Sequence, residues 1–282
     1  MISITELTDL PQVYGYQLHF AAPNFFPVDF ESWKTSFEQD VDGQGRPLFR
    51  QLHAKAAYEG DALVGFVQYG RTAFGFDDCG EISDQVSYRV IRSLYFDAGR
   101  EDAGQALLQA AMEELGAAET VYAFFHYFGM SCFARHGKLF EHSPWIAELL
   151  HGAGFTVEHE NVYYSASLQA CPATDVVIVG HDLTTGGQQT FDFLLDGEQI
   201  GCCEVHYVTP GVAYLRWIYI FEQQQNRGVG SACMNALKAW LYSRGISRLD
   251  TDTALDNLRA QHYYEKNRFT REGITRSYHL IK

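Results

Sequence analysis

The chain lacks the features that would place it in a membrane or in an oxidising compartment. No segment of its 282 residues approaches the roughly 20 consecutive apolar residues that span a bilayer. The beginning of the sequence carries Glu6 and Asp9 and no apolar run, so we expect no signal peptide. The six cysteines form neither a CxxC pair nor a zinc-like spacing with histidine, so we expect free thiols, a cytoplasmic protein and no metal.

Positive charge is also scarce. The chain has 21 Lys and Arg residues against 35 Asp and Glu residues, which gives a formal net charge of -14. An acidic surface repels phosphate backbones, so we expect no nucleic-acid partner, and it attracts cations, which favours an amine substrate. Such acidity is also typical of proteins that need it only for solubility.

Two matched pairs of segments indicate an internal duplication. Residues 58–68 and 195–205 each place a short acidic glycine turn between apolar runs, which predicts a hairpin. Residues 149–156 and 263–270 each look like a helix end that runs into a strand of aromatic and β-branched residues. Both pairs occur in the same order, which favours duplication over chance recurrence of a common hairpin.

We therefore expect two domains, residues 1–170 and 171–282, with the boundary near Pro172. The elements expected in the second domain are a strand at 176–179, the hairpin, a strand at 213–220, a helix at 228–243, a strand at 248–253, a helix at 255–266 and a strand at 270–281. The first domain adds early helices at 14–20 and 30–37, for which the second has no room. The fold class is α+β, with a mixed central sheet flanked by helices.

The segment that follows the strand ending at Ile220 carries the most specific signal. Between Gln225 and Ser231 a polar loop passes into a helix that opens with Gly228 and Gly230. Unpaired N–H groups at a helix start bind phosphate, and glycine lets it approach the backbone closely. The glycines could instead serve a tight turn. A dinucleotide-binding fold is excluded because only about 50 residues follow Gly230, and a P-loop because no Gly-Lys-Ser/Thr follows.

The run from Gln225 to Gly230 resembles the Gln/Arg-x-x-Gly-x-Gly/Ala signature of GNAT N-acetyltransferases, whose loop cradles the coenzyme A diphosphate. Residues 257–269 are similar to the family's second signature, Asn-x-x-Ala-x-x-hydrophobic-Tyr-Glu-Lys-x-Gly-Phe, with Arg268 where the family has glycine. The resemblance implies acetyl-coenzyme A as the cofactor. The residues implied to bind it are Ile218, Ile220, Gln225, Asn226, Arg227, Gly228, Val229, Gly230, Ser231, Asn257 and Tyr264.

The resemblance also implies roles. A backbone N–H near Ile218 or Ile220 would polarise the thioester carbonyl. Asn257 would contact the pantetheine arm or the nearby helix start, and Tyr264 would protonate the departing thiolate unless it is simply an interfacial aromatic. The superfamily does not fix the general base. Glu204 ranks first among the candidates, which also include His206, Glu222, Asp250 and Asp252.

The first half resembles a degenerate copy. Its counterpart of the first signature places Glu101 where glutamine or arginine is expected, and a carboxylate there disfavours a diphosphate. Leu150 occupies the tyrosine position and cannot donate a proton. We expect a GNAT-like fold that has lost the chemistry and contributes to the acceptor site of the second domain, or that only packs its aromatic residues in its own core. These aromatic residues are Phe25, Phe26, Trp33, Phe74 and Phe76.

Together these features predict an acetyl-coenzyme-A-dependent N-acetyltransferase. It would move an acetyl group by direct attack to a primary amine of a small molecule or peptide. The alternative is a non-catalytic acyl-coenzyme-A-binding sensor or interaction protein, which Arg268 and the unassigned base favour. We expect no membrane partner, and a homodimer is left open.

Overall fold

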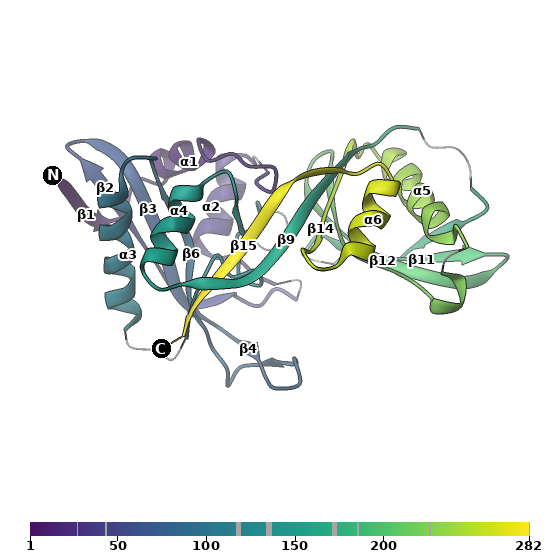
Figure 1. Ribbon diagram of the computed structural model, residues 1–282, viewed down its shortest axis with the longest axis horizontal. Coiled ribbons are helices and arrows are strands. Elements are labelled where there is room, and N and C mark those ends of the chain that lie inside the picture. The colour runs from purple at the N-terminus through teal and green to yellow at the C-terminus, as the bar shows by residue number, and fades with distance from the viewer. Residues whose placement is uncertain are drawn as a thin grey trace. The chain divides into compact units, whose positions relative to one another are not determined.

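The chain folds into two compact units (Figure 1). The computed structural model describes residues 1–26, 28–42, 44–116, 120–133, 137–170, 174–184, 186–225 and 227–281. Unit 1 is built mainly from the residues up to Glu160 and from the C-terminal segment that begins at Thr275, and unit 2 from residues 161–274. Within the described ranges, no helix has both the length and the hydropathy that a membrane crossing requires.

Unit 1 consists of a mixed sheet with helices on both of its faces. Its elements are β1 (Ile2–Glu6), α1 (Leu10–Leu18), α2 (Phe30–Glu38), β2 (Phe49–Glu59), β3 (Ala62–Thr72), β4 (Gly75–Phe76), β5 (Ile82–Ser83), β6 (Arg89–Phe96), α3 (Glu101–Leu115), β7 (Thr120–Ala123), β8 (Leu139–Phe140) and α4 (Pro144–Gly152). The strand order is β1-β2-β3-β6-β7-β15, where β15 is the C-terminal strand (Thr270–Ile281). Only β6 and β7 run parallel in this sheet.

The central strand β3 shows how the layers are arranged. Successive side chains of a strand point to opposite faces. Phe66 contacts Tyr16 of α1 and Phe37 of α2, whereas the next residue back, Gly65, lies against Leu107 of α3. Helices α1 and α2 therefore cover one face of the sheet, and α3 covers the other.

Unit 2 repeats this plan without the two early helices. Its elements are β9 (Thr156–Ser167), β10 (Val177–Gly180), β11 (Gln188–Leu195), β12 (Glu198–Thr209), β13 (Val212–Ile220), the short 3-10 helix η1 (Glu222–Gln224), α5 (Val229–Tyr242), β14 (Arg248–Ala254) and α6 (Leu258–Lys266). The strand order is β9-β14-β13-β12-β11-β10, and only β13 and β14 run parallel. The described residues between β10 and β11 contain no helix, as the short sequence there predicts.

Most expected elements are present, and capping side chains explain where the helix starts differ. Helix α1 begins at Leu10, earlier than expected, because Asp9 accepts a hydrogen bond from the Gln12 backbone N–H at 2.9 Å. Helix α6 begins at Leu258, later than expected, because Asn257 caps it through a 3.1 Å bond from the Ala260 N–H.

The strands β9 and β15 each serve both units. From Asn161 to Ser167, β9 pairs with β14 and completes the sheet of unit 2. From Tyr278 to Ile281, β15 pairs with β7 and completes the sheet of unit 1. Side chains add to these pairings: in unit 2, Tyr163 of β9 donates to Asp250 of β14 at 2.7 Å, and in unit 1, Ser277 of β15 donates at 2.6 Å to Glu158, which belongs to the first residues of β9.

The division of the chain therefore differs from the boundary expected between residues 170 and 171. The last strand of the first half, β9, contributes its residues from Asn161 onward to unit 2, and the last strand of the second half, β15, contributes its residues from Thr275 onward to unit 1. Hydrophobic patterns identify strands but not their partners, which is why the sequence could not reveal this exchange. Pro172, the expected marker of the boundary, lies outside the described residues.

This exchange predicts that the expected second domain does not fold alone. A fragment of residues 174–282 lacks β9, so the edge of β14 loses its partner strand and the buried Asp250 loses its hydrogen bond from Tyr163. We expect no cooperative thermal unfolding of this fragment by circular dichroism, and recovery of a transition in a fragment of residues 156–282. A sharp transition for residues 174–282 would contradict the assigned pairing of β9.

Candidate active site

The parallel strands β13 and β14 of unit 2 separate near their middle. Pairing between β13 and β14 runs from Val212 opposite Arg248 to Leu215 opposite Thr251, although β13 continues to Ile220. The cause is a β-bulge. Because Val205 of β12 opposes Leu215 and Glu204 opposes Trp217, Arg216 is left as an extra residue. Such a bulge bends the strand that carries it, here away from β14.

The bend leaves one backbone edge of β13 open. The N–H of Phe221 donates to the Ile200 carbonyl at 3.0 Å, so Phe221 faces β12. Backbone groups of successive strand residues point to opposite edges. The N–H groups of Ile218 and Ile220 therefore face the open edge, and their expected role as donors to a carbonyl stays a prediction.

Helix α5 starts beside this edge without a side-chain cap. Its N-cap residue is Gly228, which has a φ of 81° and no capping hydrogen bond, whereas Asp9, Asp29 and Asn257 cap three other helices. A Cβ on Gly228 would meet nothing within 4 Å, so the helix start opens to space. The exposed side chain of Arg227 precedes it. Uncapped N–H groups with a neighbouring cation favour an anion. Asn226 lies outside the described residues.

Gly230 has a different role from Gly228. A Cβ there would lie 3.1 Å from the ring of Tyr263, and the Tyr263 hydroxyl donates to the Gly230 carbonyl at 2.8 Å. This glycine therefore permits close packing of α6 against α5. Of the two glycines expected to let a diphosphate approach the backbone, Gly228 alone has open space around it, and its contact with a diphosphate stays a prediction. Val229 and Ser231 are half-buried in the same helix turn.

Gln225 ties the loop to its surroundings. Its side-chain amide donates to the Ile220 carbonyl at 2.7 Å, and its oxygen accepts a 2.5 Å bond from the Arg259 guanidinium. Arg259 thus brings a second cation to the loop. Sequence reasoning missed it, although it lies two residues after Asn257 in the second signature, because its neighbour Gln225 is distant in sequence.

Tyr264 lies where the strands separate. Its side chain is buried, and its hydroxyl lies within hydrogen-bonding reach of Thr251, which is the last residue of β14 paired with β13. The Thr251 hydroxyl also donates to the Leu215 carbonyl at 2.9 Å. Burial raises the pKa of Tyr264, so this phenol keeps its proton at neutral pH and can act as a donor.

The remaining residues of the second signature serve the local fold. Asn257 uses its side-chain oxygen to cap α6, which leaves its amide NH₂ for other partners. Arg268 adopts the left-handed conformation, with a φ of 63°, that the usual glycine would adopt freely. The turn is thus preserved despite the substitution, at a cost of about 1–2 kcal/mol.

The candidates for the general base differ in their burial and in the hydrogen bonds that their side chains already form. Glu204 accepts a charge-assisted hydrogen bond from Arg216, and both side chains are largely buried. Asp250 is fully buried between Tyr163 and Arg248, which gives it a structural role. The other three remain candidates. Asp252 accepts a 2.8 Å bond from Tyr214, Glu222 is exposed in η1, and His206 shares a strand face with Glu204.

Glu204 lies on the sheet face that no helix of unit 2 covers. Trp217 stands directly opposite it, and Tyr219 follows on the same face; they are 38% and 49% exposed. In unit 1 the corresponding Tyr95 is only 5% exposed and packs against Phe20, which follows α1. The missing early helices therefore leave an aromatic surface beside the open strand edge.

Unit 1 has the same frame but fills it with its own side chains. Arg92 is the bulged residue there, because Gln68 opposes Ser93 and Tyr69 opposes Ile91. Its buried guanidinium donates to Asp40 and to the carbonyls of Ser36 and Phe128. It is therefore surrounded by helix and loop residues of its own unit.

The start of α3 also lacks a side-chain cap, but its first turn is acidic. Glu101 accepts a 3.2 Å bond from the Gly99 N–H, and Arg100 forms ion pairs with Glu59 and Asp102 at 2.8 and 3.2 Å. Leu150 is fully buried at the position that corresponds to Tyr264. The aromatic residues that could have lined an acceptor site are mostly core residues of this unit, since Phe25, Phe26, Trp33 and Phe74 are buried.

The comparisons with known proteins identify the fold. Residues 156–269 match the model of the acetyltransferase (GNAT) family. Comparison with curated protein sequences found no match. A solved tandem GNAT protein from the clavulanic acid biosynthesis pathway is 12% identical, with a TM-score of 0.63 over 100% of this chain and 98% of the other.

Two further solved structures have the same fold. A GCN5-related N-acetyltransferase from Sphaerobacter thermophilus is 12% identical, with a TM-score of 0.61 over 99% of this chain and 95% of the other. The glucosamine N-acetyltransferase region of a fungal multi-domain GH3 β-N-acetylglucosaminidase is 10% identical, with a TM-score of 0.66 over 99% of this chain and 38% of the other. Residues 156–269 thus match the GNAT family model, and the chain has the fold of a tandem GNAT protein.

The packing of Gly230 generates a stability prediction. Gly230→Val forces new methyl groups against the Tyr263 ring and should lower the free energy of unfolding by about 1–3 kcal/mol. Gly15→Val is the matched control, because a Cβ on Gly15 of α1 meets nothing within 4 Å. Thermal unfolding of the coenzyme-free protein measures both. Equal melting temperatures for Gly230→Val and wild type would show that Gly230 does not serve packing.

Proposed function

We propose that the GNAT domain at residues 156–269 transfers the acetyl group of acetyl-coenzyme A to a primary amine of a small molecule or peptide. The observation that carries this proposal is the uncapped start of α5 beside the open edge of β13, with the protonated Tyr264 at the point where the strands separate. An anion-binding helix start, backbone donors and a proton donor are what transfer from a thioester requires.

The start of α5 fits the coenzyme's diphosphate. Its uncapped N–H groups and the macrodipole favour negative charge, and Gly228 leaves space where a side chain would stand. Arg227 supplies a cation directly before the helix, and Gln225 holds Arg259 beside the loop. We assign the coenzyme contact to residues 225–231 and to the amide of Asn257. The bound coenzyme supplies an activated acetyl thioester.

The open edge of β13 supplies donors for the carbonyl oxygen. The N–H groups of Ile218 and Ile220 point away from β12, so a carbonyl placed along this edge can accept from one of them. Such a fixed donor stabilises the negative charge that develops on the oxygen during attack, and the loss of one donor in comparable sites slows catalysis about 100- to 1,000-fold.

Tyr264 completes the transfer by donating its proton to the leaving thiolate. Burial raises the pKa of Tyr264, so the hydroxyl keeps its proton until the thiolate forms beside it. Thr251 orients this hydroxyl at the end of the β13–β14 pairing. The side chain thus holds one proton at one atom, which is the role of a general acid.

The amine must reach the site as the neutral base. We assign its deprotonation to Glu204, directly or through water, with Arg216 fixing the carboxylate in place. Trp217 and Tyr219 offer exposed rings on the same sheet face, against which an acceptor can stack. One fold neighbour is described as a glucosamine N-acetyltransferase region, so amino sugars belong in the acceptor panel.

A coenzyme-binding sensor without turnover is the second candidate. The ion pair between Glu204 and Arg216 favours it, since a carboxylate held by a guanidinium is less available to an amine. The test is release of free thiol from acetyl-coenzyme A across a panel of amino sugars, polyamines and peptide N-termini. Saturable coenzyme binding with no release for any acceptor would support the sensor.

Removal of the Tyr264 hydroxyl tests the general acid. Tyr264→Phe should lower kcat about 10-fold or more and leave coenzyme affinity nearly unchanged, as loss of a proton donor predicts. Tyr164→Phe is the matched control, because it removes the hydroxyl of a neighbouring tyrosine, which donates to Glu265. Equal kcat values for Tyr264→Phe and wild type would remove Tyr264 from the mechanism.

A charge placed at the helix start tests the coenzyme contact. Two like unit charges 4 Å apart repel by about 4 kcal/mol at an effective dielectric constant of 20, so Gly228→Glu should weaken coenzyme A binding about 100-fold or more. Gly99→Glu makes the same change at a positive-φ glycine just before α3, where a Cβ also meets open space, and should leave affinity unchanged. Calorimetric titration measures both, and the opposite ranking would place the diphosphate in unit 1.

A further inference from the structure

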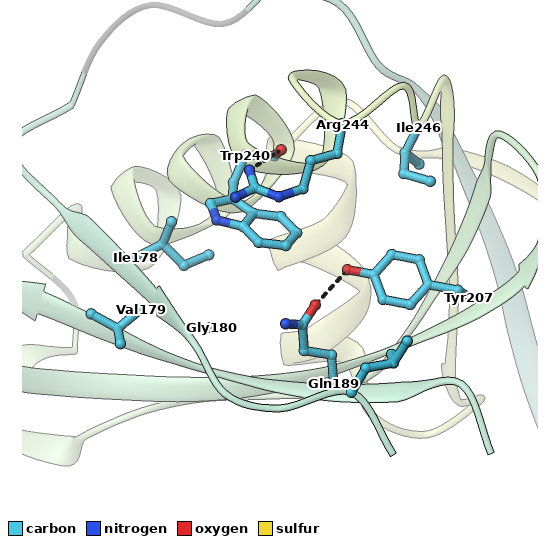
Figure 2. A pocket seen from close by; sticks show the side chains of 9 residues that line it. Ile178, Val179, Gly180, Gln189, Tyr207, Trp240, Arg244 and Ile246 are labelled. Carbon is cyan, nitrogen blue, oxygen red and sulfur yellow. Dashed lines mark hydrogen bonds between the residues drawn. The ribbon is translucent and has the colours of Figure 1, made fainter. Parts of the chain in front are cut away.

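Unit 2 contains a groove of about 810 Å³ at the far end of α5 (Figure 2). It lies between the edge strand β10, the neighbouring parts of β11 and β12, and the C-terminal end of α5. The residues that line it are Ile178, Val179, Gly180, Leu183, Gln189, Tyr207, Trp240, Arg244 and Ile246. Its volume falls within the range of small-molecule sites.

This groove is separate from the candidate active site. None of its lining residues belongs to the loop at residues 225–231, to the open edge of β13 or to the second signature. Twelve helical steps separate Gly228 from Trp240, which corresponds to roughly 18 Å along α5. The proposed acetyl transfer therefore leaves the groove without a function.

The groove contains one formal charge, and it is positive. Arg244 stacks on the Trp240 indole, with its guanidinium carbon 3.4 Å from the ring centroid. One of its nitrogens donates to the Trp240 carbonyl at 3.3 Å and to the Ser243 hydroxyl at 3.2 Å, so the group is fixed while its other N–H donors remain for a ligand. No lining residue carries a carboxylate. The lining of this recess is therefore locally positive on a chain of net charge -14.

The rest of the lining is apolar apart from one fixed polar pair. Tyr207 donates to the Gln189 side-chain oxygen at 2.8 Å (Figure 2). The Gln189 amide donates to the His181 carbonyl at 2.7 Å. Burial raises the pKa of Tyr207 to about 12, although the charge of Arg244 acts against this rise, which places the two groups within electrostatic reach. Ile178, Ile246 and the Trp240 ring supply apolar walls.

We propose that this groove binds a small amphipathic carboxylate. Its carboxylate accepts hydrogen bonds from Arg244, and its aromatic or branched body lies against Trp240, Ile178 and Ile246. A guanidinium pairs with a carboxylate through charge-assisted bonds, and the surrounding apolar surface strengthens them by excluding water. The ligand class is thus defined by one anionic head and one apolar body, both of which the groove requires.

The experiment titrates the coenzyme-free, full-length protein with 3-phenylpropionate by calorimetry. We expect saturable binding of one molecule per chain. The affinity should exceed that of 3-phenylpropylamine, which has the same body and the opposite charge, and of acetate, which has the charge without the body, by about 10-fold or more. Because no coenzyme is present, the result is independent of whether the acetyl-transfer proposal holds.

Two variants locate the binding. Arg244→Gln should weaken 3-phenylpropionate binding about 10-fold or more, whereas Arg271→Gln, the same change at an exposed arginine outside the groove, should not. Val179→Glu adds a carboxylate to the wall of the groove, at a side chain that is 41% exposed, so we expect little effect on folding. This variant should weaken binding of 3-phenylpropionate but not binding of 3-phenylpropylamine. Equal binding of acid and amine, undiminished binding by Arg244→Gln, or no saturable binding would overturn the proposal.

Discussion

The parting of β13 from β14 is the constraint on which the proposed site depends. One extra residue, Arg216, bends β13 away after Leu215, and this bend exposes a backbone edge that a regular sheet would have paired. The start of α5 follows β13 in the chain, and the Tyr264 hydroxyl lies near Thr251, the last residue of β14 that pairs with β13. The three parts of the proposed site, namely the backbone donors, the helix start and the Tyr264 hydroxyl, therefore lie around one local irregularity of the sheet.

The two units share this frame and differ in what fills it. Arg92 and Arg216 are both bulged residues, and Gly65 and Gly201 both oppose the last residue of the next strand. In unit 1, helices α1 and α2 cover the sheet face, and the carboxylates of Glu101 and Asp102 lie at the start of α3. In unit 2 the face is uncovered and the first turn of α5 carries no acidic side chain. The two units therefore share one frame, and the acidic side chains at the start of α3 disfavour an anion in unit 1.

The sequence predicted local structure well and long-range pairing poorly. The helix expected at 228–243 is found as Val229–Tyr242 and the strand expected at 270–281 has those bounds, because opening glycines and an amphipathic pattern mark the helix, and aromatic and β-branched residues mark the strand. The strand exchange was missed because β9 and β15 have the same pattern whichever unit they join. The roles of Gly230 in packing and of Arg259 beside Gln225 depend on contacts distant in sequence, which no motif spacing displays.

Hydrogen–deuterium exchange with and without acetyl-coenzyme A tests the central claim most directly. If the open edge of β13 and the uncapped start of α5 hold the coenzyme, exchange should slow at the amides of residues 217–221 and 227–231 and stay unchanged at residues 97–104 before and within the start of α3. Slowed exchange at residues 97–104 alone, or no change at 217–221 and 227–231 under saturating coenzyme, would contradict the account.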